Sequence, residues 1–172
     1  MELKYKAYKE NGAIFSSCKN YRYLLWRKLS DANLSLTFIM LNPSIADHRL
    51  NDNTVKKCMK YASKWGYGRL VIVNLFGYIS TSPEELRTSQ NPIGRYNDFF
   101  IKQAVSASSF IVCAWGNNGK IRNRDLDVLA LLNKYEKKVA VFGLTKQGRP
   151  MHPLYLSQMA KPKLINLTEL IG

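Results

Sequence analysis

Several features that identify common protein classes are missing from this chain of 172 residues. It has no apolar run long enough to cross a bilayer, and Met1 to Glu10 lacks the shape of a signal peptide. The three cysteines show no metal-binding spacing, and their odd number argues against a disulfide framework. We therefore expect a reduced, cytoplasmic, monomeric protein with no membrane partner.

The familiar nucleotide and hydrolase motifs are also missing. There is no G-x-x-x-x-G-K-[ST] and no G-x-G-x-x-G, so nucleoside triphosphates and dinucleotides are not indicated. Ser44 follows Pro43 and does not stand in the strand–turn–helix G-x-S-x-G context of a serine hydrolase. The two histidines and three cysteines give no zinc signature. We expect neither a metal nor another cofactor.

Acidic residues are scarce relative to basic ones. The chain has 26 Lys and Arg against 12 Asp and Glu, a net charge of +14. Such an excess attracts polyanions, and nucleic acid is the obvious partner. Ten Tyr, seven Phe and three Trp offer flat faces on which bases stack. The alternative is a basic protein whose aromatic residues only fill its core.

Apolar runs and helical patterns alternate along the chain. Strands are predicted at 34–41, 70–73, 110–114 and 138–142, with a short one at 163–166. A helix capped by Asn53 or Thr54 is predicted to run to Trp65. Further helices are predicted at about 95–105 and 121–135, with a short one that begins at Pro83. This order predicts one α/β domain over residues 1–172, with three α/β/α layers around a largely parallel four-stranded sheet. Residues 1–33 are expected to form an N-terminal extension that contains a β-hairpin at 13–28.

Three polar residues follow predicted core strands. Asn42 ends the first strand, where Pro43 forces a turn. Asn74 ends the second strand, and His152 lies beyond the fourth. If the strands are parallel, these residues share the edge of the sheet where ligands bind. An amide orients a water or reads a base edge, and an imidazole stabilises a developing negative charge. Hydrolysis by an oriented water is the chemistry that remains.

Three motifs resemble those of the uracil-DNA glycosylase superfamily. Met40-Leu41-Asn42-Pro43-Ser44 is similar to its G-[IM]-N-P-G motif, and Val71-Ile72-Val73-Asn74-Leu75 to its strand ending in the uracil-reading Asn. Met151-His152-Pro153-Leu154-Tyr155-Leu156-Ser157 resembles its H-P-S-P-L-S loop. The strand 110–116, which ends in Trp-Gly, also resembles the family. The likeness is closer to a group of small bacterial and phage proteins that look like distant members.

The resemblance implies a role for each motif. Asn42 would position the attacking water, Asn74 would bind the flipped base, and His152 would stabilise the departing base anion. Pro43, Ser44, Phe76 and Tyr78 would complete the substrate site. The residues expected to contact duplex or single-stranded DNA are Leu154, Tyr155, Ser157, Lys146 and Arg149.

The first motif has Asn where a carboxylate would activate water more strongly. Asp47 and Asp52 follow closely and are candidates for the general base. Met40 and Ser44 stand where the family has glycine, and Leu154 stands where it has serine. From these departures together we expect a different, bulkier, modified base. The resulting hypothesis is a DNA glycosylase that acts on a uracil-like or modified base, in repair or in defence against modified phage DNA. The alternatives are a non-catalytic nucleic-acid-binding module and a hydrolase of free nucleosides or nucleotides.

Overall fold

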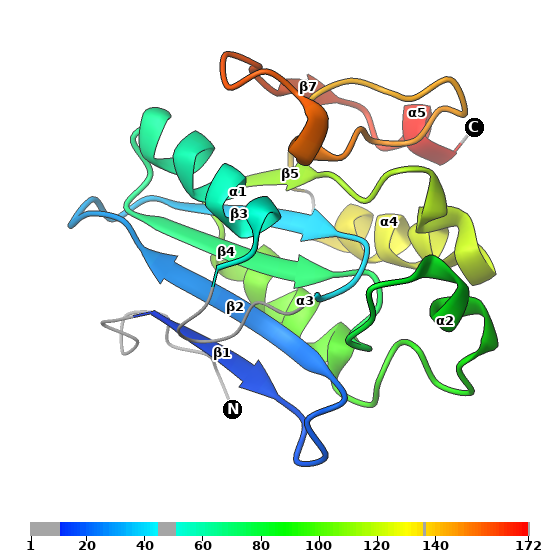
Figure 1. Ribbon diagram of the computed structural model, residues 1–172. Coiled ribbons are helices and arrows are strands. Elements are labelled where there is room, and N and C mark those ends of the chain that lie inside the picture. The colour runs from blue at the N-terminus through cyan, green and yellow to red at the C-terminus, as the bar shows by residue number, and fades with distance from the viewer. Residues whose placement is uncertain (1–10, 45–50, 136, 172) are drawn as a thin grey trace.

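A mixed sheet of seven strands forms the centre of the fold, in the order β1-β2-β4-β3-β5-β6-β7 (Figure 1). The computed structural model describes residues 11–44, 51–135 and 137–171. The strands are β1 (Gly12–Phe15), β2 (Arg22–Lys28), β3 (Ser35–Met40), β4 (Arg69–Asn74), β5 (Phe110–Cys113), β6 (Val139–Val141) and β7 (Lys163–Ile165). The α-helices are α1 (Asn53–Lys64), α2 (Pro83–Thr88), α3 (Asn97–Ala107), α4 (Arg124–Lys134) and α5 (Thr168–Ile171). None of the helices in these ranges is long and apolar enough to span a membrane.

The direction of the strands changes toward both edges of the sheet. Strands β4, β3, β5 and β6 run parallel to one another, whereas β1, β2 and β7 join by antiparallel pairing. The α/β class is confirmed, but the prediction of a four-stranded, largely parallel sheet is wrong. The predicted hairpin is present, yet it is part of the sheet rather than an extension, because β2 pairs with β4 from Leu25–Ile72 to Lys28–Arg69.

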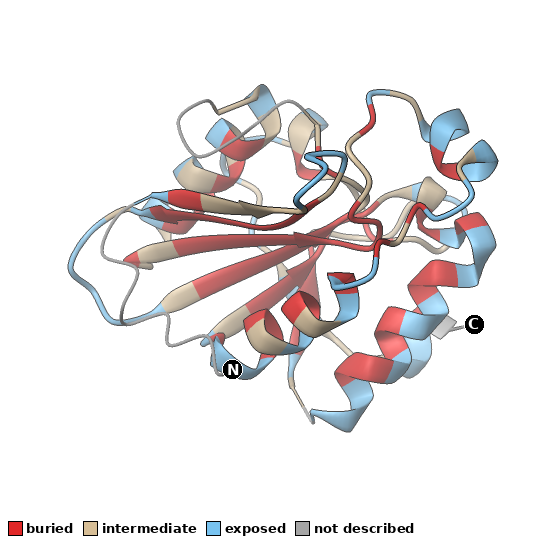
Figure 2. Cartoon of the chain, turned by 90° about the horizontal axis from the view of Figure 1, so that it is seen from below, coloured by how far each residue is buried: buried red, intermediate tan, exposed pale blue. Residues whose placement is uncertain are grey.

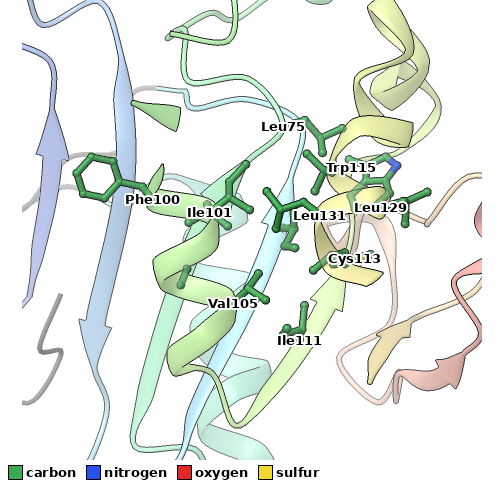
Figure 3. Packing of buried hydrophobic residues seen from close by; sticks show 14 of the residues in the cluster. Leu75, Phe100, Ile101, Val105, Ile111, Cys113, Trp115, Leu129 and Leu131 are labelled. Carbon is green, nitrogen blue, oxygen red and sulfur yellow. The ribbon is translucent and has the colours of Figure 1, made fainter. Parts of the chain in front are cut away.

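Helices cover both faces of the sheet and give three layers (Figure 2). Side chains alternate between the faces along each strand. On β4, Leu70 and Ile72 pack with buried residues of α1, and Val71 and Val73 pack on the opposite side with α3 and α4. Figure 3 shows residues of this second cluster, with Phe100 and Ile101 of α3 toward one end and Trp115 and Leu129 toward the other. Full burial of one such side chain stabilises the fold by about 1.5–3 kcal/mol.

Local side-chain chemistry sets the ends of two helices. Asp52 caps α1, where its Oδ1 accepts a hydrogen bond from the Val55 N–H at 2.8 Å, one residue before the expected cap at Asn53 or Thr54. The helix expected at 121–135 begins only at Arg124. The preceding 3₁₀ segment η2 (Asn117–Asn123) contains an extended Ile121, and its last two residues have positive φ. This backbone cannot continue into an α-helix.

Candidate functional site

The carboxyl ends of β3, β4 and β5 meet at a cavity of about 440 Å³. Strand β3 lies between β4 and β5. After β3 the chain forms β4 on one side of it and later forms β5 on its other side. The crevice outside such a switch point is the general ligand site of open α/β sheets. Residues 40–42, Asn74 and residues 115–118 line the cavity, together with Asp52 and His152. The two amides and the imidazole singled out from the sequence therefore share one cavity.

Asn42 is held in one orientation by the backbone. Its Nδ2 donates hydrogen bonds to the Ser80 carbonyl oxygen at 2.7 Å and to the Pro43 carbonyl oxygen at 3.0 Å. Carbonyl oxygens only accept hydrogen bonds, so the nitrogen of the amide must face them. Within the described part of the chain the Oδ1 of Asn42 has no donor. The side chain thus offers an oriented acceptor to a water or a ligand.

Asn74 is the deepest polar residue of the cavity. It is only 2% exposed, and its Nδ2 has no hydrogen-bond partner among the described residues. Asn97 fixes the backbone there, because its Nδ2 donates to the carbonyl oxygens of Asn74 and Leu75, both at 2.9 Å. A buried amide without a partner costs free energy unless a ligand or a water binds it. Asn74 is therefore well placed to bind a ligand.

His152 closes the cavity on the β5 side. The Gly116 N–H donates to the Pro150 carbonyl oxygen at 2.9 Å, which holds the His152 segment against Gly116. Gly116 has φ +71° and ψ −171°, a conformation that essentially only glycine adopts. The Nδ1 of His152 accepts a hydrogen bond from the Leu154 N–H at 3.3 Å. The proton of the neutral ring is therefore on Nε2, which makes His152 a hydrogen-bond donor.

Burial lowers the pKa of His152, and the nearby Asp52 carboxylate partly opposes this shift. The ring is thus neutral at physiological pH. The unfolded chain takes up this proton at a higher pH than the folded chain, so the free energy of unfolding decreases as the pH falls through the ordinary histidine value of about 6.5. A neutral imidazole can donate from Nε2 to a developing anion without carrying a charge beforehand.

Asp52 combines a structural role with a place in the cavity. One carboxylate oxygen caps α1, and the residue lines the cavity close enough to His152 to influence its pKa. Asp52 is therefore the candidate for a general base that the structure places in the cavity. Asp47, the other candidate, lies outside the described residues.

Replacing Asp52 by asparagine is expected to lower the pKa of His152 further, because the change removes the negative charge that favours the imidazolium. Asparagine retains a cap oxygen for α1, so the helix should remain intact. A pH titration of the histidine ring signals by NMR measures the change. Asp31→Asn, in the exposed loop before β3, is the control and should leave the titration unchanged. An unchanged or raised His152 pKa in Asp52→Asn would contradict the proximity of the two side chains.

The remaining substrate-site predictions have mixed outcomes. Ser44 lines the cavity. Pro43 is buried and does not line it, but its carbonyl oxygen accepts from Asn42 and from the Ser80 N–H, so it positions the first motif. Phe76 was expected in the substrate site, but it is fully buried in the core cluster beside α3 and α4. Tyr78 instead packs edge-to-face on Tyr21, with ring centroids 5.6 Å apart.

The loop after His152 is fixed to α1 and exposes one aromatic ring. Lys57 Nζ donates to the Leu156 carbonyl oxygen at 2.5 Å, and Tyr61 Oη to the Ser157 carbonyl oxygen at 2.6 Å. Tyr155, in the 3₁₀ turn η3 (Pro153–Tyr155), is 88% exposed and borders the cavity. Its ring centroid lies 6.4 Å from that of His152. Leu154 does not line the cavity.

The two basic residues expected to contact DNA differ in environment. Lys146 is exposed in the turn after β6. The Arg149 Nε lies 3.3 Å from a carboxylate oxygen of the buried Asp125, and its Nη1 donates to the Leu170 carbonyl oxygen at 3.1 Å. The guanidinium of Arg149 is therefore committed to the fold, which argues against its predicted DNA contact.

Several residues of the cavity were not predicted from the sequence. Arg22, the first residue of β2, is 3% exposed and lines the cavity. Trp115, Asn117 and Asn118 line it from the segment after β5, and Ser80 from the loop after β4. Asn117 and Asn118 follow a predicted core strand, as Asn42 and Asn74 do, so the same criterion would have selected them. Arg22 carried no such signal, because its strand was assigned to an extension.

Comparison with known proteins identifies one family. Residues 22–154 match the model of the family described as protein of unknown function (DUF1643). The chain belongs to this family. The DUF1643 span includes Arg22, Asn42, Asn74 and His152. No curated protein and no solved structure matches the chain. Among the residues that the structure describes, no cluster of three or more His, Cys, Asp or Glu side chains could hold a metal ion.

Proposed function

We propose that this DUF1643 protein is a DNA glycosylase-like hydrolase that cleaves the N-glycosidic bond of a flipped uracil-like or modified base. The observation that supports it is the single cavity shared by Asn42, Asn74 and His152 at the carboxyl edge of the parallel strands. The uracil-DNA glycosylase-like fold is part of the same proposal. It rests on the motifs around these residues and on the position of the cavity.

The proposed reaction is a hydrolysis in which water replaces the base at the sugar. The Oδ1 of Asn42 accepts a hydrogen bond from the water and orients its oxygen toward the sugar carbon C1′. The bond between C1′ and the base nitrogen breaks, and its electron pair leaves with the base. The Asp52 carboxylate takes the proton lost by the water, and solvent later protonates the released base.

His152 and Asn74 act on the base in this proposal. The neutral His152 ring donates from Nε2 to a base oxygen that gains negative charge as the bond breaks. A positioned donor stabilises that charge more in the transition state than in the bound substrate. Asn74 hydrogen-bonds the amide-like edge of the extruded base. Its burial excludes water from this contact.

The surroundings of the cavity suit a nucleic acid. The net charge of +14 favours a polyanionic partner. Tyr155 stands at the rim, 88% exposed, where an aromatic ring can fill the gap that a flipped base leaves. We propose that a monomer acts on DNA in the cytoplasm, in repair or in defence against modified phage DNA.

The deciding experiment is a screen of single- and double-stranded oligonucleotides that carry different bases, scored for alkali-labile abasic sites. We expect strand cleavage at one class of base. Asn42→Ala should lower the single-turnover rate about 10²-fold, because the water loses its position. Asn53→Ala is a matched control, because Asn53 is exposed on the first turn of α1 and does not line the cavity.

Other outcomes of the same screen favour the two alternatives. DNA binding without release of any base would indicate a non-catalytic nucleic-acid-binding module. Activity on free nucleosides or nucleotides alone would indicate the small-molecule hydrolase. Ionic strength separates these cases, because duplex binding weakens steeply with salt and the binding of a small nucleotide does so much less.

A further inference from the structure

A charged side chain lies in the cavity at a place that the proposed reaction does not use. Arg22 is 3% exposed and lines the cavity from β2. Its backbone is fixed there, since the Arg22 N–H donates to the Gly77 carbonyl oxygen at 2.9 Å. A guanidinium that lines a ligand cavity can bind an anionic group of the ligand as well as acceptors of the protein.

The strand order places Arg22 far from the hydrolytic residues. Strand β2 runs antiparallel to β4, so its first residue lies at the edge where β4 ends with Asn74. Along this edge the order is β2, β4, β3, β5, and His152 adjoins Gly116 just after β5. Three strand spacings of about 4.8 Å separate β2 from β5 by roughly 14 Å. Asn74 thus lies between Arg22 and His152.

The acidic and the basic side chain of the cavity lie at opposite ends of it. Among the described lining residues, the acidic and basic side chains other than His152 are those of Asp52 and Arg22. Asp52 acts on His152 and so belongs to the hydrolytic end. The opposite end holds the guanidinium. A base that reaches only from His152 to Asn74 would not contact the guanidinium.

Arginine has the geometry to recognise one class of ligand group. Its planar guanidinium carries five N–H donors, enough to bind a protein acceptor and a ligand together. Two parallel N–H groups match the oxygen spacing of a carboxylate or a phosphate. The low dielectric of a buried site strengthens this attraction.

We propose that Arg22 forms an anion subsite of this cavity and that the ligand carries an anionic oxygen group beyond its base ring. The group is either a carboxylate on the base or a phosphate of a nucleotide, which present the same chemistry to the guanidinium. This inference rests on the proposed function only for the binding of the base ring between Asn74 and His152.

Two pairs of ligands test the subsite, because the members of each pair differ by one anionic group. The pairs are uracil with 5-carboxyuracil and uridine with uridine 5′-monophosphate. Isothermal titration calorimetry on the full chain should show about 10–100-fold tighter binding for the anionic member of one pair, as expected for charged hydrogen bonds. The pair that shows the preference identifies the source of the group.

Variants of Arg22 show whether the guanidinium causes the preference. Arg22→Met should abolish the difference within the pair while uracil or uridine still binds. Arg22→Lys should keep part of it, because lysine retains the charge without the fork. Arg27→Met is the matched control. Arg27 is also buried on β2, but it bonds Asn51 and the carbonyl oxygens of Gly12 and Trp26 and does not line the cavity. Its variant should retain the preference.

The possible failures are distinguishable. If uracil and uridine bind and neither anionic partner binds more tightly, the subsite is wrong and the proposed function stands. The same conclusion follows if Arg22→Met keeps the preference. If none of the four ligands binds, the subsite is wrong, and the screen of DNA substrates still decides the proposed function. If Arg22→Met does not fold, the comparison within wild-type protein and Arg22→Lys still decides the question.

Discussion

Replacing His152 by phenylalanine is expected to lower the rate of base release about 10²–10³-fold. Removal of one positioned donor to a developing anion typically costs this much, equivalent to about 2.7–4 kcal/mol of transition-state stabilisation. Phenylalanine keeps a planar ring beside Gly116 but removes the Nε2 donor. The effect should appear in single-turnover kinetics on the base identified by the screen, with little change in DNA affinity.

A second substitution separates hydrogen bonding from packing at the same position. His152→Gln loses the ring but retains an N–H donor, so it should recover part of the rate lost in His152→Phe. Tyr155→Ala is a further comparison, because the exposed ring is proposed to act on the DNA stack rather than on the leaving base. It should weaken DNA binding and leave the pH profile unchanged. Wild-type rates in His152→Phe would remove His152 from the proposed chemistry.

Replacing Arg149 by methionine is expected to lower the free energy of unfolding by about 3–5 kcal/mol, which is the usual cost of leaving one charge of a buried ion pair without its partner. Asp125 is 1% exposed, and the Arg149 Nε lies 3.3 Å from its carboxylate. Without Arg149 the carboxylate stays buried with its charge uncompensated. The midpoint and slope of urea denaturation measure the loss.

Two further variants check this explanation. Lys146→Met removes an exposed positive charge from the same loop and should change stability by no more than about 0.5 kcal/mol. The double variant Asp125→Asn, Arg149→Met removes both charges and should recover most of the stability, because no unpaired buried charge remains. A loss below about 1 kcal/mol in Arg149→Met would show that the pair contributes little. It would also reopen the prediction that Arg149 contacts DNA.

Most elements and two of the main site residues could be predicted because their signals are local. An apolar run followed by Asn-Pro fixes where β3 ends, and therefore where Asn42 lies. The apolar run 70–73 does the same for Asn74. Such patterns operate over a few residues and need no knowledge of the partner strands. His152 lies further beyond its predicted strand, and the resemblance to the uracil-DNA glycosylase superfamily supplied its motif.

Other features depended on contacts between distant parts of the chain. The hairpin was expected as an extension, because no sequence pattern within 13–28 indicates that β2 pairs with β4. Arg22 was overlooked for the same reason. Phe76 was placed in the substrate site by its nearness to Asn74 in the chain, yet its side chain is fully buried in the core cluster formed with α3 and α4. Arg149 was expected to contact DNA, because the buried Asp125 that binds it is 24 positions earlier in the sequence.

The sequence by itself determined the α/β class, the basic charge, and the strand ends at which Asn42 and Asn74 lie. These depend on composition and on short patterns whose physical effect is local. Only the tertiary structure decided that these amides, His152, Asp52 and Arg22 share one cavity. That outcome depends on strand order and register, which arise from the packing of both sheet faces and not from any single segment.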